Sequence, residues 1–121
     1  MLLANRPLKI LHILDHSLPL HSGYSFRSYN IFRTQLQRGW QPVVLTSPKH
    51  QASWSGPVYA MEEIHGIRHY RTKALSQSTG PLAPELQFMA VLARRLREVI
   101  QSEQPDILHA HSPVLNALPA W

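Results

Sequence analysis

Hydrophobic and polar positions along the chain form short apolar runs separated by amphipathic stretches. Residues 8–14 (LKILHIL) and 41–47 (QPVVLTS) are nearly continuous apolar runs of strand length. Such runs are typical of strands that are buried on both faces of a parallel sheet. Between them, residues 24–38 place Tyr29, Phe32 and Leu36 at helical spacing. The order strand, helix, strand predicts a right-handed βαβ unit.

The first predicted helix carries its own start and stop signals. Ser22 or Ser25 can cap its amino end, because a serine side chain accepts a hydrogen bond from a free backbone N–H. Gly39 follows its last turn, where glycine readily adopts the left-handed conformation that ends a helix.

The second half of the chain repeats the alternation. Residues 58–72 predict two short strands around Gly66, while 47–57 and 74–84 are rich in Ser and Pro and predict loops. Residues 85–102 predict an amphipathic helix with its arginines on the polar face. Its apolar positions are Leu86, Met89, Leu92, Ala93, Leu96, Val99 and Ile100. Residues 106–112 predict a strand, and Pro113 suits the first turn of a further helix.

Together these elements predict one α/β domain over residues 1–121, with a doubly wound, mainly parallel sheet that is incomplete at its C-terminus. In such sheets ligands bind beyond the carboxyl ends of the strands. Segments 15–25, 46–57 and 109–114 fall there. We expect this edge to gather five histidines, namely His16, His21, His50, His109 and His111.

The pair Ser22-Gly23 at the helix start has two interpretations. A glycine lets a ligand approach the backbone, and free N–H groups with the helix dipole attract an anion. A cap and tight turn that bind nothing explain the same residues. Tyr24 and Arg27 follow in the sequence and can line a binding site, with Arg27 facing either solvent or an anionic ligand.

The histidines of the last strand also have alternatives. His109 and His111 share a face if the strand persists, and a metal cluster with His16 and His21 is conceivable. No carboxylate or cysteine accompanies them at a recognised ligand spacing, so we expect no metal and no bound cofactor. We expect His109, like His12, to be a buried structural histidine. His111, at the strand tip, is the functional candidate, as a hydrogen-bonding group for a polar ligand.

Composition narrows the class of protein. A chain of 121 residues with 44% hydrophobic and 16% charged residues is typical of a single globular domain, and it contains no cysteine. Its formal charge of +5 favours acidic partners. No nucleic-acid motif accompanies the cluster Arg94, Arg95 and Arg97, so we expect a solvated helix face and no nucleic-acid partner. The apolar start is too short and too polar for a membrane span or signal sequence, which predicts a cytoplasmic protein.

Two segments, LKILHILDHSLPLHSGYSFRSYNIFRTQLQRGWQPVVLTSPKH and QPDILHAHSPVLNALPA, resemble the amino-terminal domain of family 4 retaining glycosyltransferases. The resemblance covers nearly the whole chain. The run H-S-x-P-x-H-S-G-Y-x-F-R is similar to the branch associated with exosortase and exopolysaccharide loci. The resemblance implies the Rossmann-like half of a two-domain GT-B fold, which transfers a sugar from a nucleotide-sugar donor to a polysaccharide or lipid-linked acceptor.

The same resemblance implies roles for individual residues. His111 lies at the interdomain cleft near the reacting sugar and is the candidate catalytic residue. Many members carry two adjacent glycines where this chain has Ser22-Gly23. The implied substrate-binding residues are His16, His21, Ser22, Gly23, Tyr24, Arg27 and Ser112. The domain that holds most of the donor, with its paired glutamates, lies outside these 121 residues, so we expect a truncated fragment without transfer activity alone.

Two alternatives remain at this point. The chain can be a stand-alone α/β interaction module that contacts an anionic membrane surface, such as the inner face of the cell membrane, through helix 85–102. A small flavodoxin-like nucleotide-binding domain is less favoured, because no fuller phosphate-binding loop is present. An incomplete sheet leaves apolar surface exposed, so we also expect the fragment to self-associate.

Overall fold

The computed structural model describes residues 6–73 and 83–111. In chain order the elements are β1 (Lys9–Leu14), α1 (Gly23–Gln37), β2 (Gln41–Thr46), α2 (Pro48–Ser53), β3 (Met61–Ile64), β4 (Ile67–Arg71), α3 (Ala83–Glu103) and β5 (Ile107–Ala110). No helix in this described part of the chain is both long and apolar enough to cross a membrane.

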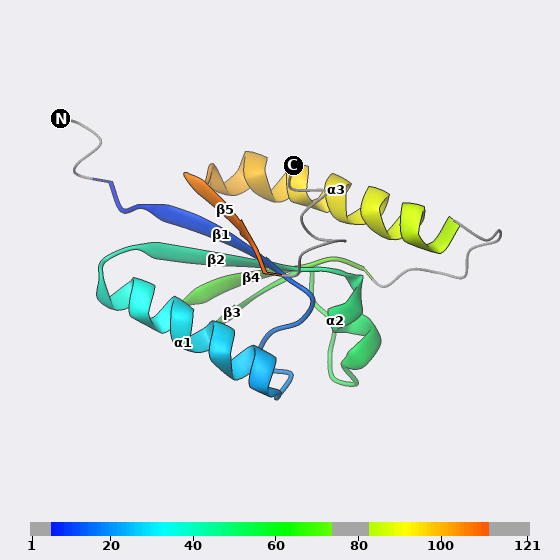
Figure 1. The fold of residues 1–121 in the computed structure, drawn as a ribbon, viewed down its shortest axis with the longest axis horizontal. Coiled ribbons are helices and arrows are strands. Elements are labelled where there is room, and N and C mark those ends of the chain that lie inside the picture. Colours follow the sequence, from blue (N-terminus) through cyan, green and yellow to red (C-terminus); the bar gives the residue numbers. More distant parts are fainter. Residues whose placement is uncertain (1–5, 74–82, 112–121) are drawn as a thin grey trace.

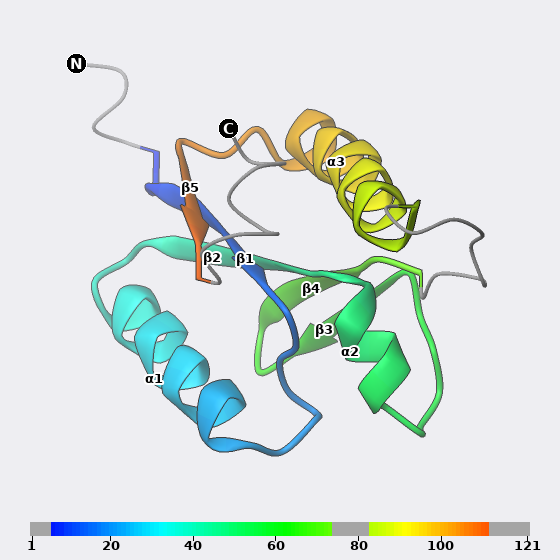
Figure 2. The same ribbon diagram turned by 45° about the vertical axis from the view of Figure 1, so that its right-hand side comes forward.

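The strands form one five-stranded sheet in the order β3-β4-β2-β1-β5. All neighbours pair in parallel except β3, which forms an antiparallel hairpin with β4. Gly66 has a φ of 79° in the hairpin turn, a conformation that glycine adopts without steric cost. Helices α1 and α3 cover opposite faces of the sheet (Figures 1 and 2). The predicted doubly wound α/β fold is confirmed.

Each face of the sheet has its own apolar core, because successive side chains of a strand point to opposite faces. Leu11 and Ile13 of β1 pack with Leu92 and Val99 of α3 on one face. On the other face, Leu14 and Val44 pack with Phe32 of α1. Every strand residue from Ile10 to Leu14 is buried, which explains the nearly continuous apolar run in the sequence.

The helix signals in the sequence are mostly confirmed. The Ser22 side chain accepts a hydrogen bond from Ser25 N at 3.0 Å and caps α1, and Gly39 ends it with a φ of 79°. Leu36 and Leu86, predicted on apolar helix faces, are exposed. Leu36 lies in the last turn of α1 and Leu86 in the first turn of α3, so both are close to a helix end.

One loop prediction was wrong. Residues 48–53, expected within a loop, form the short helix α2. Ser47 caps it by accepting from Lys49 N at 3.3 Å, and Pro48 supplies a first-turn residue with a suitable φ. The segment is too short and polar to show helical periodicity. The predicted loop over 74–82 and the helix beginning at Pro113 lie outside the described residues.

A buried carboxylate, Glu103, ties three elements together at the amino edge of the sheet. Arg68 of β4 donates two hydrogen bonds to it at 2.6 and 2.7 Å, Tyr70 of β4 donates one, and Lys9 of β1 donates one at 3.2 Å. These groups, with the Arg68 hydrogen bonds as the largest cause, lower the pKa of Glu103 to about 2. The end of α3 is therefore anchored to β1 and β4 by charge.

We expect Glu103 to make the fold acid-sensitive. Its folded-state pKa lies below the ordinary value, so its stabilisation is present above that value and is lost as pH falls towards 2. The unfolding free energy of the unmodified chain should fall between about pH 6 and about pH 3, as measured by urea denaturation. This fall should be about 2 kcal/mol larger than the fall for the Glu103→Gln variant. Glu63→Gln, at an exposed site, is the control and should retain the acid sensitivity.

We also expect self-association through β5, an edge strand among those described, where Ile107 is 46% exposed. Sedimentation velocity should show a concentration-dependent increase in size. Ile107→Lys should reduce the association, because a charge on an edge strand opposes pairing with a second chain. Val58→Lys, at an exposed loop position, should not. A sharp monomer at every concentration contradicts this expectation.

Candidate functional site

The carboxyl edge of the sheet gathers segments that are distant in the sequence. Strands β1, β2, β4 and β5 are parallel, so the residues that follow them meet at one edge. This edge carries loop 15–22 after β1, Ser47 after β2, Thr72 after β4 and His111 after β5. Polar residues from four segments therefore converge at the carboxyl edge of the sheet.

Arg71, at the end of β4, holds the loop after β1 in place. Its buried guanidinium donates to Ser17 Oγ at 2.7 Å and to the carbonyl of Leu18 at 2.7 Å. It also donates to Thr46 Oγ1 at 3.3 Å and to the Glu62 carboxylate at 3.1 Å. Three strands and the loop thus share one planar donor group, which fixes the loop relative to the sheet.

His50 of α2 also contacts the loop after β1. Its Nδ1 accepts a hydrogen bond from the backbone N–H of Ser17 at 3.3 Å. Burial, followed by the nearby positive charge of Arg71, lowers the pKa of His50 to about 3. The ring is therefore neutral at pH 7, and its buried Nε2 has no hydrogen-bond partner within residues 6–73 and 83–111.

Several predicted site residues are engaged with one another. His16 Nε2 lies 2.8 Å from Ser22 Oγ, and the His16 ring packs on Tyr24 with centroids 4.6 Å apart. The Tyr24 hydroxyl accepts from the backbone N–H of Asp15 at 3.2 Å. Burial lowers the pKa of His16. These side chains shape the loop and cap α1, so the capping interpretation of Ser22 holds whether or not a ligand binds.

Other predicted site residues are exposed at the surface. A Cβ added to Gly23 would meet no atom within 4 Å, so the backbone at the start of α1 is accessible from outside. His21 is exposed and packs on Phe26, with ring centroids 5.3 Å apart. Arg27 is exposed one turn further along α1. Ser112 lies outside the described residues.

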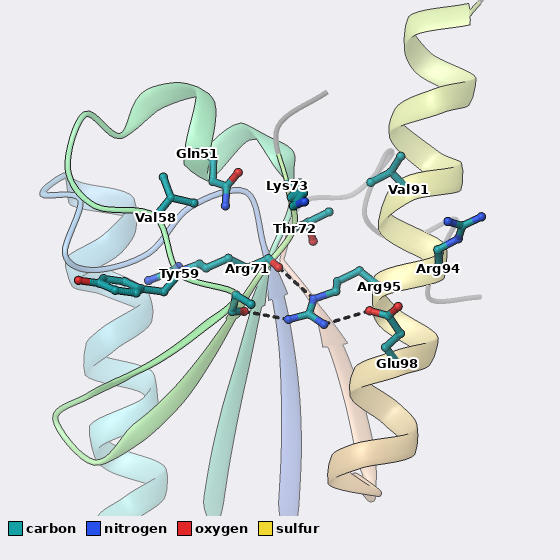
Figure 3. A pocket seen from close by; sticks show the side chains of 11 residues that line it. Gln51, Val58, Tyr59, Arg71, Thr72, Lys73, Val91, Arg94, Arg95 and Glu98 are labelled. Atoms are coloured by element: carbon teal, nitrogen blue, oxygen red, sulfur yellow. Dashed lines mark hydrogen bonds and ion pairs between the residues drawn. The ribbon is translucent and has the colours of Figure 1, made fainter. Parts of the chain in front are cut away.

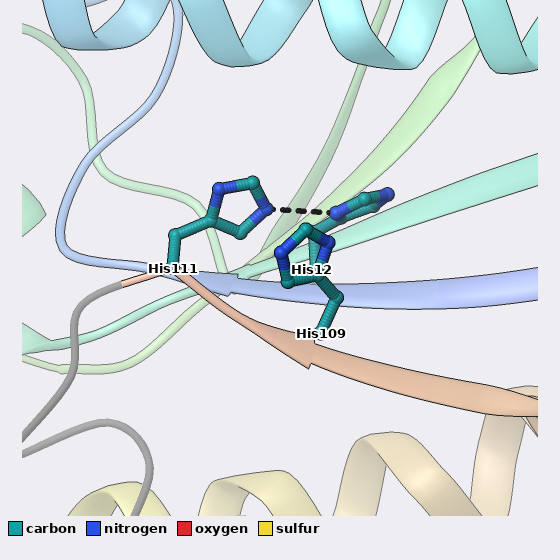
Figure 4. Close-up of side chains that lie close together, drawn as sticks. All are labelled: His12, His109 and His111. Carbon is teal, nitrogen blue, oxygen red and sulfur yellow. Dashed lines mark hydrogen bonds between the residues drawn. The ribbon is translucent and has the colours of Figure 1, made fainter.

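His111 belongs to a cluster of three histidines on the α1 side of the sheet (Figure 4). His12 Nδ1 lies 2.9 Å from His111 Nε2, and His12 Nε2 lies 2.8 Å from Gln35 Oε1 of α1. The rings of His109 and His111 are stacked, with centroids 4.1 Å apart and planes inclined by 19°. We name His12, His109 and His111 the histidine cluster.

The electrostatics of the histidine cluster favour neutral rings. Burial lowers the pKa of His12 to about 4. Burial, with smaller effects of the charges on His109, His12 and Arg27, lowers the pKa of His111 to about 3. Gln35 Oε1 can only accept, so His12 carries its proton on Nε2 and accepts at Nδ1 from His111. His111 Nδ1 then keeps a lone pair.

The expectation for His109 was wrong, because its side chain is exposed. His109 pairs with His12 in register, but β5 is an edge among the described strands, so no further strand covers His109 from that side. His12 is buried as expected, yet it also belongs to the candidate site. The sequence signal for His12 was a polar residue inside an apolar run. Such a position indicates that the buried side chain has a hydrogen-bond partner, but it does not identify that partner.

The surface of the described residues has two depressions of similar volume. One, of about 550 Å³, runs along α1 and is lined by Arg27, Gln35 and Trp40. It includes Gln35, whose side-chain oxygen lies 2.8 Å from His12 Nε2. Trp40 is exposed there and lies against Arg38, with the guanidinium carbon 5.6 Å from the ring centre.

The other depression, of about 520 Å³, lies between α3 and the β3–β4 hairpin (Figure 3). Arg95 crosses it and donates to the carbonyls of Arg71 at 3.0 Å and Ala60 at 2.8 Å. Its guanidinium also pairs with Glu98. Arg95 is thus committed to the fold, whereas Arg94 is exposed. None of the residues predicted for the site lines this depression.

Comparison with known proteins gives one finding about family. The family model described as Glycosyltransferase Family 4 matches residues 22–121, which is most of the chain. No curated protein matches this chain. The match begins at Ser22, the cap of α1, and includes Gly23, Arg27, His109 and His111.

We expect Arg71→Met to destabilise the fold by about 3 kcal/mol, because it removes the donor to Ser17 Oγ and to the Leu18 carbonyl and leaves Glu62 without its buried partner. Urea denaturation measures the change. Arg33→Met, on the exposed surface of α1, should change the unfolding free energy by no more than about 0.5 kcal/mol. Equal effects of the two substitutions would show that Arg71 does not anchor the loop.

Proposed function

The chain belongs to glycosyltransferase family 4, and from that premise we propose that it is the acceptor-side domain of an enzyme that transfers a sugar from a nucleotide-sugar donor to a polysaccharide or glycolipid acceptor. The proposal includes retention of anomeric configuration and a role in exopolysaccharide synthesis, on the similarity of the run around residues 16–27 to that branch. A cytoplasmic location, with contact at the inner face of the cell membrane, fits a lipid-linked acceptor.

The observation that carries the proposal is the open backbone at Gly23 beside Arg27, at the same edge as His111. A Cβ at Gly23 would touch nothing within 4 Å, and Arg27 is exposed with its charge near enough to lower the pKa of His111. Backbone N–H groups at the start of a long helix and a guanidinium both attract phosphate oxygens. This end of α1 therefore suits the diphosphate of a sugar nucleotide.

In this proposal the residues act by position and charge. Arg27 and the N–H groups after Ser22 offset the negative charge that develops on the leaving diphosphate. His111, neutral at pH 7 and hydrogen-bonded to His12, contacts the reacting sugar through its second ring nitrogen. His16, Ser22 and Tyr24 hold the loop, so the donors are placed before substrate arrives.

In this proposal the acceptor is a small molecule, a polysaccharide or a lipid-linked saccharide, and the donor is held mainly by a second domain. The 121-residue chain should therefore show no turnover when it is incubated with sugar nucleotides and candidate acceptors. Nucleotide release, measured by a coupled assay, gives the readout. Robust turnover by the chain alone would contradict the assignment of the donor site to a second domain.

The diphosphate contact can be tested in the chain itself by ¹H–¹⁵N NMR titration with uridine diphosphate and guanosine diphosphate. We expect shifts at Ser22, Gly23 and Arg27 and none in the β3–β4 hairpin. Arg27→Ala should weaken binding about tenfold, as expected for one charge-assisted hydrogen bond. Arg33→Ala, an exposed arginine elsewhere on α1, is the control. Shifts confined to the hairpin, or equal effects of both variants, would contradict the proposed site.

A further inference from the structure

The histidine cluster has the composition and spacing of a metal site, although no ligand spacing in the sequence indicates one. The side chains of His12, His109 and His111 each offer a ring nitrogen, and these atoms all lie within 4.8 Å of one another. We propose that the cluster binds one transition-metal ion of the Zn²⁺ type, with water or an anionic oxygen in the fourth position. The proposed metal site shares His111 with the proposed sugar-transfer site, but it rests on the contacts among the three histidines and not on the diphosphate contacts at Gly23 and Arg27.

One pair of ligand nitrogens is already close to the separation that such an ion requires, and all three lie within 4.8 Å of one another. Zn–N bonds of about 2.0–2.1 Å in a tetrahedral site place two ligand nitrogens about 3.3 Å apart. His12 Nδ1 and His111 Nε2 are 2.9 Å apart, so an ion would fit between them after a shift of about 0.4 Å, and the proton of His111 Nε2 would move to Nδ1, which keeps the ring neutral. The stacked ring of His109 lies beside His111 and supplies the third nitrogen.

The surroundings fix the ligands before any ion arrives. Gln35 Oε1 accepts from His12 Nε2 at 2.8 Å, which directs His12 Nδ1 towards the cluster. This is the partner that metal-binding histidines characteristically have on their second nitrogen. The backbone is equally constrained, because His12 pairs with His109 in the parallel register and His111 N donates to the carbonyl of Ile13 at 2.9 Å.

Burial and ligand chemistry decide the kind of ion. His12 is buried, His111 is half-buried and His109 is exposed, so the cluster has a closed side and an open side through which an ion can enter. Three imidazoles suit Zn²⁺, Ni²⁺ or Cu²⁺, whereas Mg²⁺ and Ca²⁺ require oxygen ligands. The three imidazole ligands are neutral, so the site has a net positive charge when a divalent ion is bound. This charge attracts an anionic oxygen.

The test uses the full 121-residue chain after removal of any affinity tag and of metal by EDTA and dialysis. Isothermal titration with ZnCl₂ should give one ion per chain, and CoCl₂ should produce the visible absorption of tetrahedral cobalt. His109→Ala should weaken Zn²⁺ binding at least about tenfold, and Gln35→Leu about tenfold, the lower end of the effect of losing such a partner. His109 is exposed, so its loss leaves the fold intact, which circular dichroism verifies.

His21→Ala and His65→Ala are the matched controls, because both histidines are exposed and lie outside the cluster. Both should keep the affinity and stoichiometry of the unmodified chain. Equal Zn²⁺ binding by the unmodified chain and His109→Ala would overturn the proposal, as would an equal loss in His21→Ala. A failure of diphosphate binding at Arg27 leaves the Zn²⁺ titration unaffected, so the two proposals fail separately.

Discussion

The candidate site depends on the parallel register between β1 and β5. This register pairs His12 with His109, and its last backbone hydrogen bond, from His111 N to the carbonyl of Ile13, brings His111 beside them. A shift of one residue would turn the β5 side chains to the other face of the sheet, because successive side chains alternate. The histidine cluster would then be lost even if every strand were retained.

Two buried charged groups, one at the amino edge of the sheet and one at the carboxyl edge, connect its strands to neighbouring elements. Glu103 joins α3 to β1 and β4 at the amino edge, and Arg71 joins the loop after β1 to β2 and β4 at the carboxyl edge. A buried charge is tolerated only when it is paired and fully hydrogen-bonded, so each group specifies one arrangement of its neighbours. Residues 17 and 18 of the loop that precedes Ser22 and Gly23 are therefore held by Arg71 of the sheet.

The two proposals concern one edge of the molecule and have a common electrostatic consequence. The open backbone at Gly23 and the side chain of Arg27 both favour an anion. An ion held by the histidine cluster would add positive charge on the same α1 side of the sheet. His111 connects the two, because its pKa responds to Arg27 and its ring contacts His12 and His109.

The amino-acid sequence by itself determined the α/β class, the hairpin around Gly66, the cap at Ser22 and the edge of the sheet where polar residues gather. These follow from local periodicity and from the rule that parallel strands end together. Only the tertiary structure decided that His109 is exposed, that Arg71 holds the loop, and that His12 and Gln35 complete a cluster with His111. Those contacts join residues far apart in the chain, and the order and register of strands that create them leave no periodic signal in any single segment.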